Sequence, residues 1–518
     1  MEGGRGGAAA GSIAPAEEEP SRREIRVVFL GLMIVLGLGA LDQSIVAPAL
    51  PRIVDEFGGL AHLSWVVTAY VLTATATMPL YGRLSDQYGR KPVLYAAILI
   101  FLLGSALSGA AQSLWELILF RAVQGLGAGG LLPLAQIIIG DLVTPAERGR
   151  RQGAIVAMFA VCSIVGPVLG GVITDLLSWH WIFYVNLPIG IVALAAIAQA
   201  LRRPFPRRER RIDYAGALLL TGSTVAFLLI LALGGTEWPW LSPQTAALSG
   251  ITLVLVALFV LHLLRVTEPV LPPALFRDRL FVVACVVLAL ASMGMMGAGL
   301  FFPLFFQLVL GASAANSGLL TGPMMLGVVI SSITNGRVLL RYGRYKPAQV
   351  AGLVVAVASF AVLAWSAATS QALALIEVAM LALGLGIGLV MPNMTVAVQN
   401  ALPMANRGVG TATLAFFRSL GGLVGVTGAG AILALQLHGA AMPAAGRALV
   451  ESAAPVALIP LYRHAIAVVF TSGVYVVAAA LVVILFLPEL PLRKTHRPED
   501  SPSSLPAAPP RSPSPRDR

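Results

Sequence analysis

The sequence has little charge and almost no cysteine. Lys, Arg, Asp and Glu together make up 11% of its 518 residues, whereas soluble proteins carry about 25%. Only Cys162 and Cys285 are present, both in apolar runs, so a disulfide framework is not expected. The sequence also lacks a P-loop, an HExxH pair, a CxxC pair and a nucleophilic GxSxG turn. We therefore expect neither an enzyme nor an ATP-driven protein, and no metal or organic cofactor.

Long hydrophobic runs dominate the chain instead. Hydrophobic residues account for 57% of it, and the mean hydropathy is +0.85. A membrane-spanning helix needs about 20 mainly apolar residues. The fourteen runs that satisfy this lie near 27–48, 62–81, 92–112, 115–139, 153–176, 182–201, 213–234, 246–265, 281–308, 318–336, 348–368, 373–395, 409–433 and 464–487. They predict an all-α integral membrane protein, and the first run is too long for the apolar core of a signal peptide.

The basic residues are distributed asymmetrically between the two sides of these predicted spans. If both termini are cytoplasmic, 30 of the 35 Lys and Arg residues lie on that side. Of the others, Arg52, Arg447 and Arg463 lie outside, and Arg121 and Arg418 fall within spans. This is the excess that cytoplasmic loops carry in membrane proteins. It predicts a multi-pass protein of a bacterial cytoplasmic (inner) membrane and explains the net charge of +11 without a nucleic-acid partner.

An internal repeat divides the chain into two halves. Residues 82–91 read GRLSDQYGRK and residues 336–346 read GRVLLRYGRYK, each after the second span of a six-span set. We predict one six-helix bundle at 26–201, a basic loop with an inserted two-helix hairpin at 202–265, and a second six-helix bundle at 266–490. Repeated halves with a site between them are typical of alternating-access transporters.

The remaining segments are predicted to have no packed core. Residues 1–25 and 491–518 are rich in Gly, Ala, Ser and Pro, so we expect disordered cytoplasmic tails. The basic stretch RRPFPRRERR at 202–211 could bind nucleic acid or anionic lipid, but a topology signal is the better interpretation. The outer segment 434–463 could fold over a cavity mouth, which the sequence alone does not show.

Six segments of the chain resemble motifs of a known family. The first copy of the repeat is similar to the cytoplasmic signature loop of the major facilitator superfamily. The other five are similar to segments of its fourteen-span drug/proton antiporters and occur at the matching spans. They read LDQSIVAPALP (41–51), LILFRAVQGLGAGG (117–130), GPVLGG (166–171), WHWIFYVNLPIG (179–190) and FFRSLGGLVG (416–425). The resemblance implies the major facilitator fold, two six-helix bundles plus an inserted two-helix hairpin.

Asp42 lies in a run that is otherwise uncharged. A carboxylate near the bilayer centre costs roughly 2.5–3.5 kcal/mol, so an acid there is by default a functional-site hypothesis. We predict that Asp42 binds and releases protons, with Arg121 as its counter-charge and Gln124 on the same helical face as Arg121. The alternatives are an aspartate that caps or packs a helix, and an arginine that anchors the structure permanently.

The resemblance implies roles for two further segments. The loop at 82–91 would be a latch on the inward side, with its glycines permitting a tight turn, although a purely topological basic loop is the alternative. The GPVLGG helix would pack tightly on the opposite half and seal against proton leak, with simple helix packing as the alternative. One departure is Cys162, where the fifth-span motif usually has Gly. The second loop copy also has Leu340 in place of Asp86. The residues concerned are Gly82, Arg83, Asp86, Gly89, Arg90 and Lys91 in the loop, and Gly166, Pro167, Gly170 and Gly171 in the helix.

Candidates for a substrate cavity come mainly from the second half. The segment 292–307 concentrates Met and Phe, which suit a pocket that repacks around different apolar ligands. Polar groups within spans tend to face the interior of the bundle. The candidates are Met296, Phe305, Gln307, Glu377, Asn393, Phe416 and Arg418. Lipid-facing or core packing is the alternative for each apolar candidate, and an interfacial position is the alternative for Glu377.

The sequence therefore predicts a secondary antiporter that exports lipophilic or amphipathic drugs or toxic compounds by alternating access, with the proton as coupling ion. Its partners would be small lipophilic substrates, protons and the bilayer, and it would act as a monomer. One alternative is an exporter of a single metabolite or lipid. Another is a membrane scaffold or sensor that transports nothing, although such a protein would not need the Asp42–Arg121 pair inside the membrane.

Overall fold

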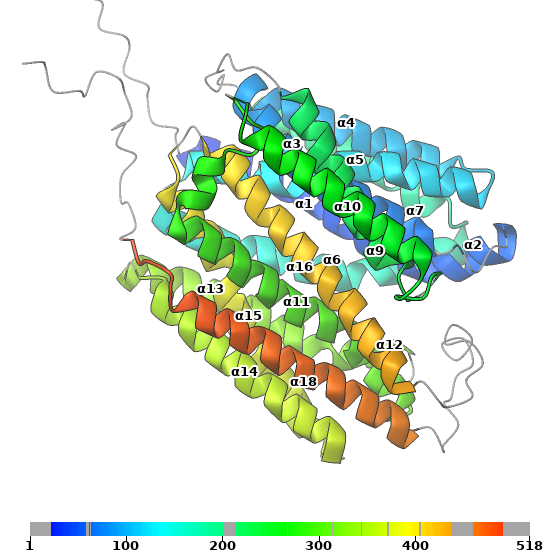
Figure 1. The fold of residues 1–518 in the computed structure, drawn as a ribbon. Coiled ribbons are helices and arrows are strands. Elements are labelled where there is room, and N and C mark those ends of the chain that lie inside the picture. The colour runs from blue at the N-terminus through cyan, green and yellow to red at the C-terminus, as the bar shows by residue number, and fades with distance from the viewer. Residues whose placement is uncertain are drawn as a thin grey trace, which may run out of the picture.

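The protein is a bundle of long helices (Figure 1). The computed structural model describes residues 22–57, 62, 64–143, 145–200, 213–235, 237–266, 268–312, 314–342, 344–369, 372–403, 406–437 and 459–490. Within these ranges all the secondary-structure elements are helices. The basic stretch at 202–211, most of the two predicted tails and most of the outer segment 434–463 lie outside the described residues.

The first half of the chain supplies six long helices. The short α2 (Leu50–Phe57) and α7 (Trp181–Tyr184) lie at the end where α1 finishes. We call that the far end of the bundle, and we call the end where α1 begins the termini end. The long helices are α1 (Arg22–Ile45), α3 (Ser64–Tyr88), α4 (Arg90–Gly109), α5 (Leu114–Leu142), α6 (Pro145–Leu176) and α8 (Asn186–Ala200).

Eight further long helices follow. The inserted hairpin consists of α9 (Tyr214–Leu233) and α10 (Pro243–Leu263). The second half contains α11 (Arg279–Leu308), α13 (Gly322–Tyr342), α14 (Lys346–Thr369), α15 (Leu373–Ala401), α16 (Arg407–Leu437) and α18 (Ile459–Ile484), with the short η3 (Pro273–Arg277) and α12 (Ala314–Leu320) before α11 and α13. Because α18 runs back to the termini end, both ends of the described chain lie on one side.

The prediction of an all-α membrane protein is confirmed. Thirteen helical stretches of the described chain are long and apolar enough to cross a membrane, and α3 is the fourteenth long helix. Its threonines lower its hydropathy, although it is as long as its neighbours. The predicted span at 153–176 begins earlier in the structure, at Pro145, because helical hydrogen bonding continues past the apolar run.

Two glycine-rich segments give the halves the same internal packing. Residues 125–133 of α5 read GLGAGGLLP, and residues 384–392 of α15 read GLGIGLVMP. In α5 the glycines lie against backbone atoms of α3 and α4, and in α15 they lie against backbone atoms of α13 and α14. Any side chain there would hold the helices apart, so both bundles depend on close backbone contact. Arg121 and Met380 occupy matching positions of this repeat.

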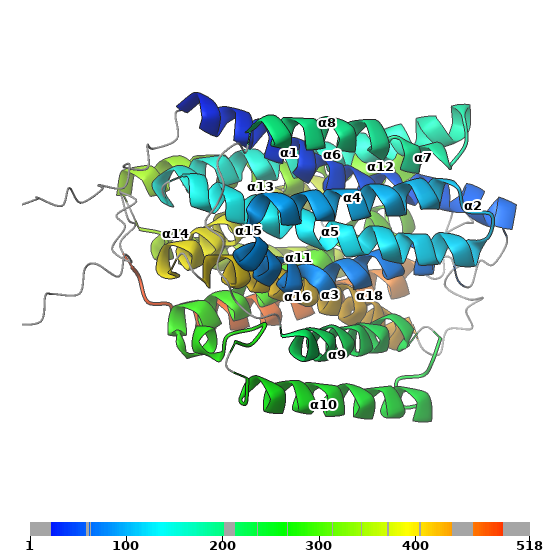
Figure 2. The same ribbon diagram turned by 90° about the horizontal axis from the view of Figure 1, so that it is seen from above.

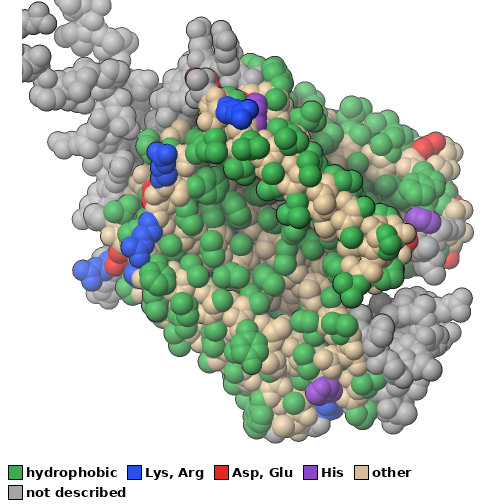
Figure 3. Space-filling view, viewed as in Figure 1, with side chains coloured by type: hydrophobic (Ala, Val, Ile, Leu, Met, Phe, Trp, Pro, Cys, Tyr) green, Lys and Arg blue, Asp and Glu red, His purple; other side chains and the backbone are tan. Residues whose placement is uncertain are grey.

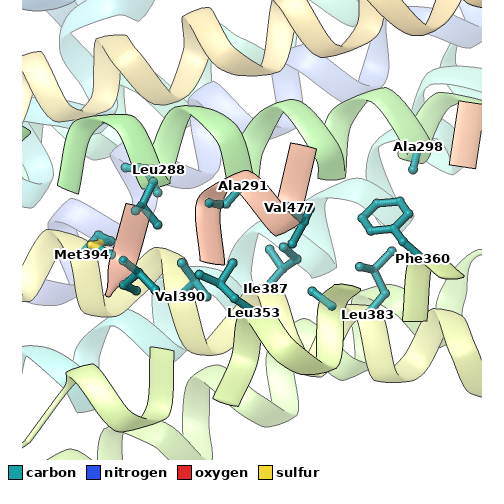
Figure 4. Packing of buried hydrophobic residues seen from close by; sticks show 14 of the residues in the cluster. Leu288, Ala291, Ala298, Leu353, Phe360, Leu383, Ile387, Val390, Met394 and Val477 are labelled. Carbon is teal, nitrogen blue, oxygen red and sulfur yellow. The ribbon is translucent and has the colours of Figure 1, made fainter. Parts of the chain in front are cut away.

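Apolar side chains fill the second half. Figure 4 shows this core, in which α11, α14, α15 and α18 interleave their side chains. Phe360 of α14 lies beside Leu383 of α15, and both are buried. The labelled members are Leu288, Ala291, Ala298, Leu353, Phe360, Leu383, Ile387, Val390, Met394 and Val477. The visible outer face is largely apolar too, and its Lys and Arg side chains gather towards the ends (Figure 3), as expected for a surface in contact with lipid.

The inserted hairpin lies outside the two bundles. Helix α9 contacts α3 of the first half and α16 of the second, and α10 packs on α9 at the edge of the molecule (Figure 2). Asp213 closes the base of the hairpin by accepting hydrogen bonds from the Gly216 N–H at 2.8 Å and from the His262 ring at 2.7 Å. Burial alone would raise the pKa of Asp213, but these hydrogen bonds outweigh it and lower the pKa.

A pair of Gly→Ala substitutions tests the close-packed repeat. A Cβ at Gly386 would collide with the backbone oxygen of Gly352, whereas a Cβ at Gly250 of α10 would meet nothing within 4 Å. We expect Gly386→Ala to destabilise the protein by about 1–3 kcal/mol through overpacking. Gly250→Ala should leave stability unchanged or raise it by up to about 1 kcal/mol. Thermal unfolding of the purified protein in detergent measures both, and equal melting temperatures would contradict the packing argument.

Candidate functional site

A buried ion pair lies in the first half towards the far end. Asp42 comes one turn before the end of α1, and its side chain is 0% exposed. Arg121 of α5 is 1% exposed, and its Nη1 atom lies 2.8 Å from Asp42 Oδ2. The two residues that the sequence predicted to pair therefore meet across two helices. With one charge of each sign buried together, neither is left uncompensated.

Two amides complete the contacts of the Asp42 carboxylate. Gln124 accepts a hydrogen bond from Arg121 Nη1 at 2.7 Å and donates one to Asp42 Oδ1 at 2.8 Å. Asn186, at the start of α8, donates to the same Oδ1 at 2.8 Å and to the Ser105 hydroxyl of α4 at 3.0 Å. Side chains of α5 and α8 thus meet the carboxylate of α1, and α4 holds one of them in place. The sequence predicted Gln124 but gave no role to Asn186, although it lies within the quoted segment 179–190.

The Arg121 guanidinium is held by more than its ion pair. Its Nε donates to the backbone oxygen of Val66 at 3.2 Å. Its Cζ lies 4.1 Å from the centre of the Tyr70 ring and 5.6 Å from that of Phe183. Cation–π contacts of this kind contribute about 2 kcal/mol or more when the cation is desolvated. Arg121 is therefore fixed in place by contacts from several helices.

A second cluster of charges lies at the termini end and joins the two halves. Arg90 of α4 pairs with Asp86 of α3, and its Nε lies 3.0 Å from Asp141 Oδ2 of α5. Arg407, the first residue of α16, reaches Asp141 Oδ1 at 3.4 Å. Asp86 Oδ2 accepts a hydrogen bond from the Val409 N–H at 3.0 Å. An acid at the unpaired N–H groups of a helix start is favourable, so this cluster holds α16 against the first half.

The glycines of the signature loop have two different roles. Gly89 adopts φ +91° and forms the turn between α3 and α4, as predicted. Gly82 lies inside α3, so the expectation that it belongs to the turn is wrong. A Cβ at Gly82 would lie 2.9 Å from the backbone oxygen of Gly408 in α16. A Cβ at Gly408 would in turn collide with the Asp86 carboxylate. Small residues thus allow the halves to touch here.

The last lysine of each loop copy binds its own half. Lys91 donates to the Ala198 backbone oxygen of α8 at 3.3 Å. Lys346 of the second copy donates to the backbone oxygens of Leu485 and Leu487, just after α18, at 2.9 and 2.8 Å. The repeat therefore fixes the last helix of each half. Arg83 lies 3.8 Å from Glu268, which follows the hairpin.

The GPVLGG helix lies between the two halves: α6 contacts α13 of the second half, as expected, but the glycines of the motif pack on α1 of their own half. A Cβ at Gly166 would collide with Ser44, and one at Gly170 would collide with the Ile45 backbone, both at the end of α1. Gly171 has nothing within 4 Å of its Cβ position, and Pro167 lies within the continuous helix α6. The reason is that the close-packing face of α6 points at α1. Contact with the second half comes nearer the termini end, where Gly153 lies against α13.

The structure separates the substrate-cavity candidates into two groups. Phe305 and Phe416 lie in apolar clusters, and Asn393 exchanges hydrogen bonds with Asn335 at 2.8 and 3.1 Å. Gln307 donates to the Ser317 hydroxyl at 2.9 Å. These contacts are accounted for by packing and local hydrogen bonding. The candidates of the second group are at least partly exposed and have no described polar partner; they are Met296, Glu377 and Arg418.

Two repeated six-helix halves, a buried acid–arginine pair and a charged junction at one end define a membrane transport protein. The sequence profile of the Major Facilitator Superfamily matches residues 32–426. The chain therefore belongs to this superfamily of transporters, and the predictions of its family, its fold class and its lack of enzymatic activity are confirmed.

Several relatives have descriptive names. The chain is 38% identical over 418 residues, 80% of its length and 76% of the relative's, to the multidrug transporter protein MdtP of Bacillus subtilis (strain 168). It is 36% identical over 402 residues, 78% of each chain, to multidrug resistance protein 3 of the same organism. Its fold is similar to that of the proton:xylose symporter XylE bound to 6-bromo-6-deoxy-D-glucose, with a TM-score of 0.62, 14% identity and coverage of 90% and 96% of the two chains.

Removing the Asp86 carboxylate should open the termini end. Thr411 of α16 is 1% exposed at the contact between the halves, so a cysteine placed there reports on opening. In a background with Cys162→Ala and Cys285→Ala, we expect Asp86→Ala to raise the rate of thiol labelling of Thr411→Cys about fivefold or more, because one charged hydrogen bond to α16 is worth about 1.5–3 kcal/mol. Asp175→Ala, which breaks an exposed pair with Arg52 at the far end, is the matched control. Equal labelling rates in the two variants would refute the latch.

Proposed function

We propose that the protein exports lipophilic or amphipathic compounds in exchange for protons. The observation that carries this proposal is the fully buried Asp42–Arg121 pair, in which the carboxylate is the one group of the network that can change charge. Ionisable groups inside membrane proteins mark proton and substrate pathways. The similarity to two proteins named for multidrug transport and resistance supports the kind of cargo.

The geometry suggests how protonation of Asp42 acts on the whole molecule. Neutralising the carboxylate weakens its attraction to Arg121 and frees the end of α1. The next residues of α1, Ser44 and Ile45, pack directly on Gly166 and Gly170 of α6. Helix α6 also contacts α13 of the second half. In this proposal the shift passes from α1 through α6 to the junction between the halves, because the buried pair itself lies wholly within the first half.

The direction of transport follows from the membrane orientation that we propose. In this proposal the termini end lies in the cytoplasm, below a bacterial inner membrane. The closed junction around Asp86 and Asp141 then blocks access from the cytoplasm, so a proton would approach Asp42 from outside. A proton taken up there and released inside moves with the membrane potential and gains about 2.3 kcal/mol per 100 mV. That free energy drives a substrate out against its gradient. Because a single copy of the chain contains both the Asp42–Arg121 pair and the junction, we propose that the protein acts as a monomer.

Purified protein in liposomes tests the coupling. We expect wild type to accumulate a lipophilic dye against its gradient when a pH gradient is imposed, and to release protons when substrate is added. Asp42→Asn should abolish both while keeping substrate binding, since asparagine preserves the size and most hydrogen bonds of the side chain but cannot titrate.

Asp175→Asn is the matched control, because Asp175 pairs with Arg52 in an exposed position at the far end. We expect it to transport like wild type. Undiminished gradient-driven accumulation in Asp42→Asn would rule out the coupling role. If a panel of compounds shows transport of one metabolite-like compound alone, the protein is a dedicated exporter and not a broad one. If no compound is transported, a scaffold role is favoured.

A further inference from the structure

Arg418 is a charged side chain in the middle of α16 without a described partner. It lies about 17 Å along the helix axis from Arg407 at the termini end. Its side chain is partly buried, and it makes no hydrogen bond, ion pair or ring contact with any described residue. Arg121 provides the contrast, since that guanidinium is enclosed by a carboxylate, an amide, a carbonyl and two rings.

In the described part of the second half, no acid lies close enough in depth to neutralise this arginine. Between Arg279 and Ile484, Glu377 is the sole acidic residue that the structure describes. It lies near the far-end start of α15, about 20 Å from Arg418 in depth when both are counted along their helices. Arginine stays protonated at any physiological pH. Among the described residues, the positive charge of Arg418 is therefore not balanced by a nearby negative charge.

The position of Arg418 on α16 directs it towards the centre of the bundle. Thr411 lies about two turns earlier on the same helical face. Its hydroxyl accepts a hydrogen bond from Gln399 of α15 at 3.4 Å, and Gln399 also donates to the Gln136 backbone oxygen of α5 at 3.2 Å. Thr411 therefore faces the contact where the two halves meet. Arg418 lies about 10 Å above that contact, on the same side of the helix.

The neighbouring residues agree with this direction. Gly422, one turn beyond Arg418, lies beside Ser292 and Met296 of α11, with a Cβ position 3.1 Å from each side chain. Met296 is 49% exposed although α11 contributes to the core of the second half. In Figure 3, which views the molecule from the side along which α16 runs, the middle of the face shows no Lys or Arg side chain. A lipid-facing arginine in mid-span would also be costly.

We propose that Arg418 binds the negatively charged group of an amphipathic anion, such as a carboxylate or sulfonate, and that the exported compounds are lipophilic anions in preference to cations. The guanidinium presents a fork of N–H donors that fits such groups. The flexible thioether of Met296 lies nearby to contact the apolar part. This inference rests on the proposed export function and adds the charge of the substrate.

The proposal has a consequence for the energetics of exchange. When one anion leaves a negative interior and one proton enters it, two elementary charges move in the favourable direction. Exchange of one proton for a monovalent cation would move no net charge. A single titratable residue, Asp42, is therefore sufficient for exchange that is driven by the membrane potential as well as by the pH gradient.

Two lipophilic ions of almost equal size and opposite charge test the preference. The equilibrium affinities of radiolabelled tetraphenylborate and tetraphenylphosphonium are measured for the full-length protein in nanodiscs. The signal of empty nanodiscs is subtracted. One pH and no gradient are used, so the result does not depend on proton coupling. We expect wild type to bind tetraphenylborate about tenfold or more tightly than tetraphenylphosphonium, because an opposite charge a few ångströms away is strongly attracted where water is scarce.

Variants assign the preference to Arg418. Arg418→Met should weaken tetraphenylborate binding about tenfold and not weaken tetraphenylphosphonium binding, while Arg418→Lys should keep most of the preference. Arg279→Met, which removes an exposed basic residue at the start of α11, should match wild type. If Arg418→Met does not fold, Arg418→Gln replaces it, and the wild-type comparison alone already tests the sign.

Equal affinity of wild type for the two ions, tighter binding of the cation, or unchanged tetraphenylborate affinity in Arg418→Met would each overturn the proposal. These outcomes are separate from those of the coupling experiment. Loss of the charge preference with intact proton-driven export would remove this inference alone. Loss of proton coupling with an intact preference for the anion would remove the proposed coupling and leave the anion site.

Discussion

The buried ion pair between Asp42 and Arg121 is the constraint around which the first half is built. Both side chains are fully buried, and removing one partner of such a pair typically costs about 3–5 kcal/mol. Gln124 and Asn186 take up the remaining hydrogen-bonding capacity of the carboxylate. Because these groups come from α1, α5 and α8, the pair also sets how those helices lie relative to one another.

The two halves share a scaffold but divide the chemistry. The glycine segments of α5 and α15 bring their helices into close backbone contact in the same way. Their polar residues differ, since Met380 stands at the position that Arg121 occupies. The buried acid–arginine pair therefore belongs to the first half, whereas the second half has an apolar core and, in the middle of α16, an arginine without a described partner, Arg418. A repeat that diverged in this way can separate the proton site from the substrate site.

The junction at the termini end shows how a charged cluster can hold two bundles together and still allow them to separate. Asp86, Arg90, Asp141 and Arg407 are each less than a tenth exposed. They join the halves through a few directed contacts to the start of α16, with small residues between them. The halves also touch along α6 and α13 and along α3 and α16. At the junction itself, polar contacts can be exchanged for water if the halves separate there.

The sequence by itself determined the membrane location, the helix count and the pairing of Asp42 with Arg121. Hydropathy depends on local composition, and a buried carboxylate is costly without a counter-charge, for which Arg121 was the candidate in a neighbouring span. Tertiary structure alone decided that Asn186 and Asp141 join the charged networks, that Gly82 packs against α16, and that Gly166 contacts α1. These contacts join residues far apart in the chain, and their existence depends on the angle and rotation of packed helices, which residue spacing does not encode.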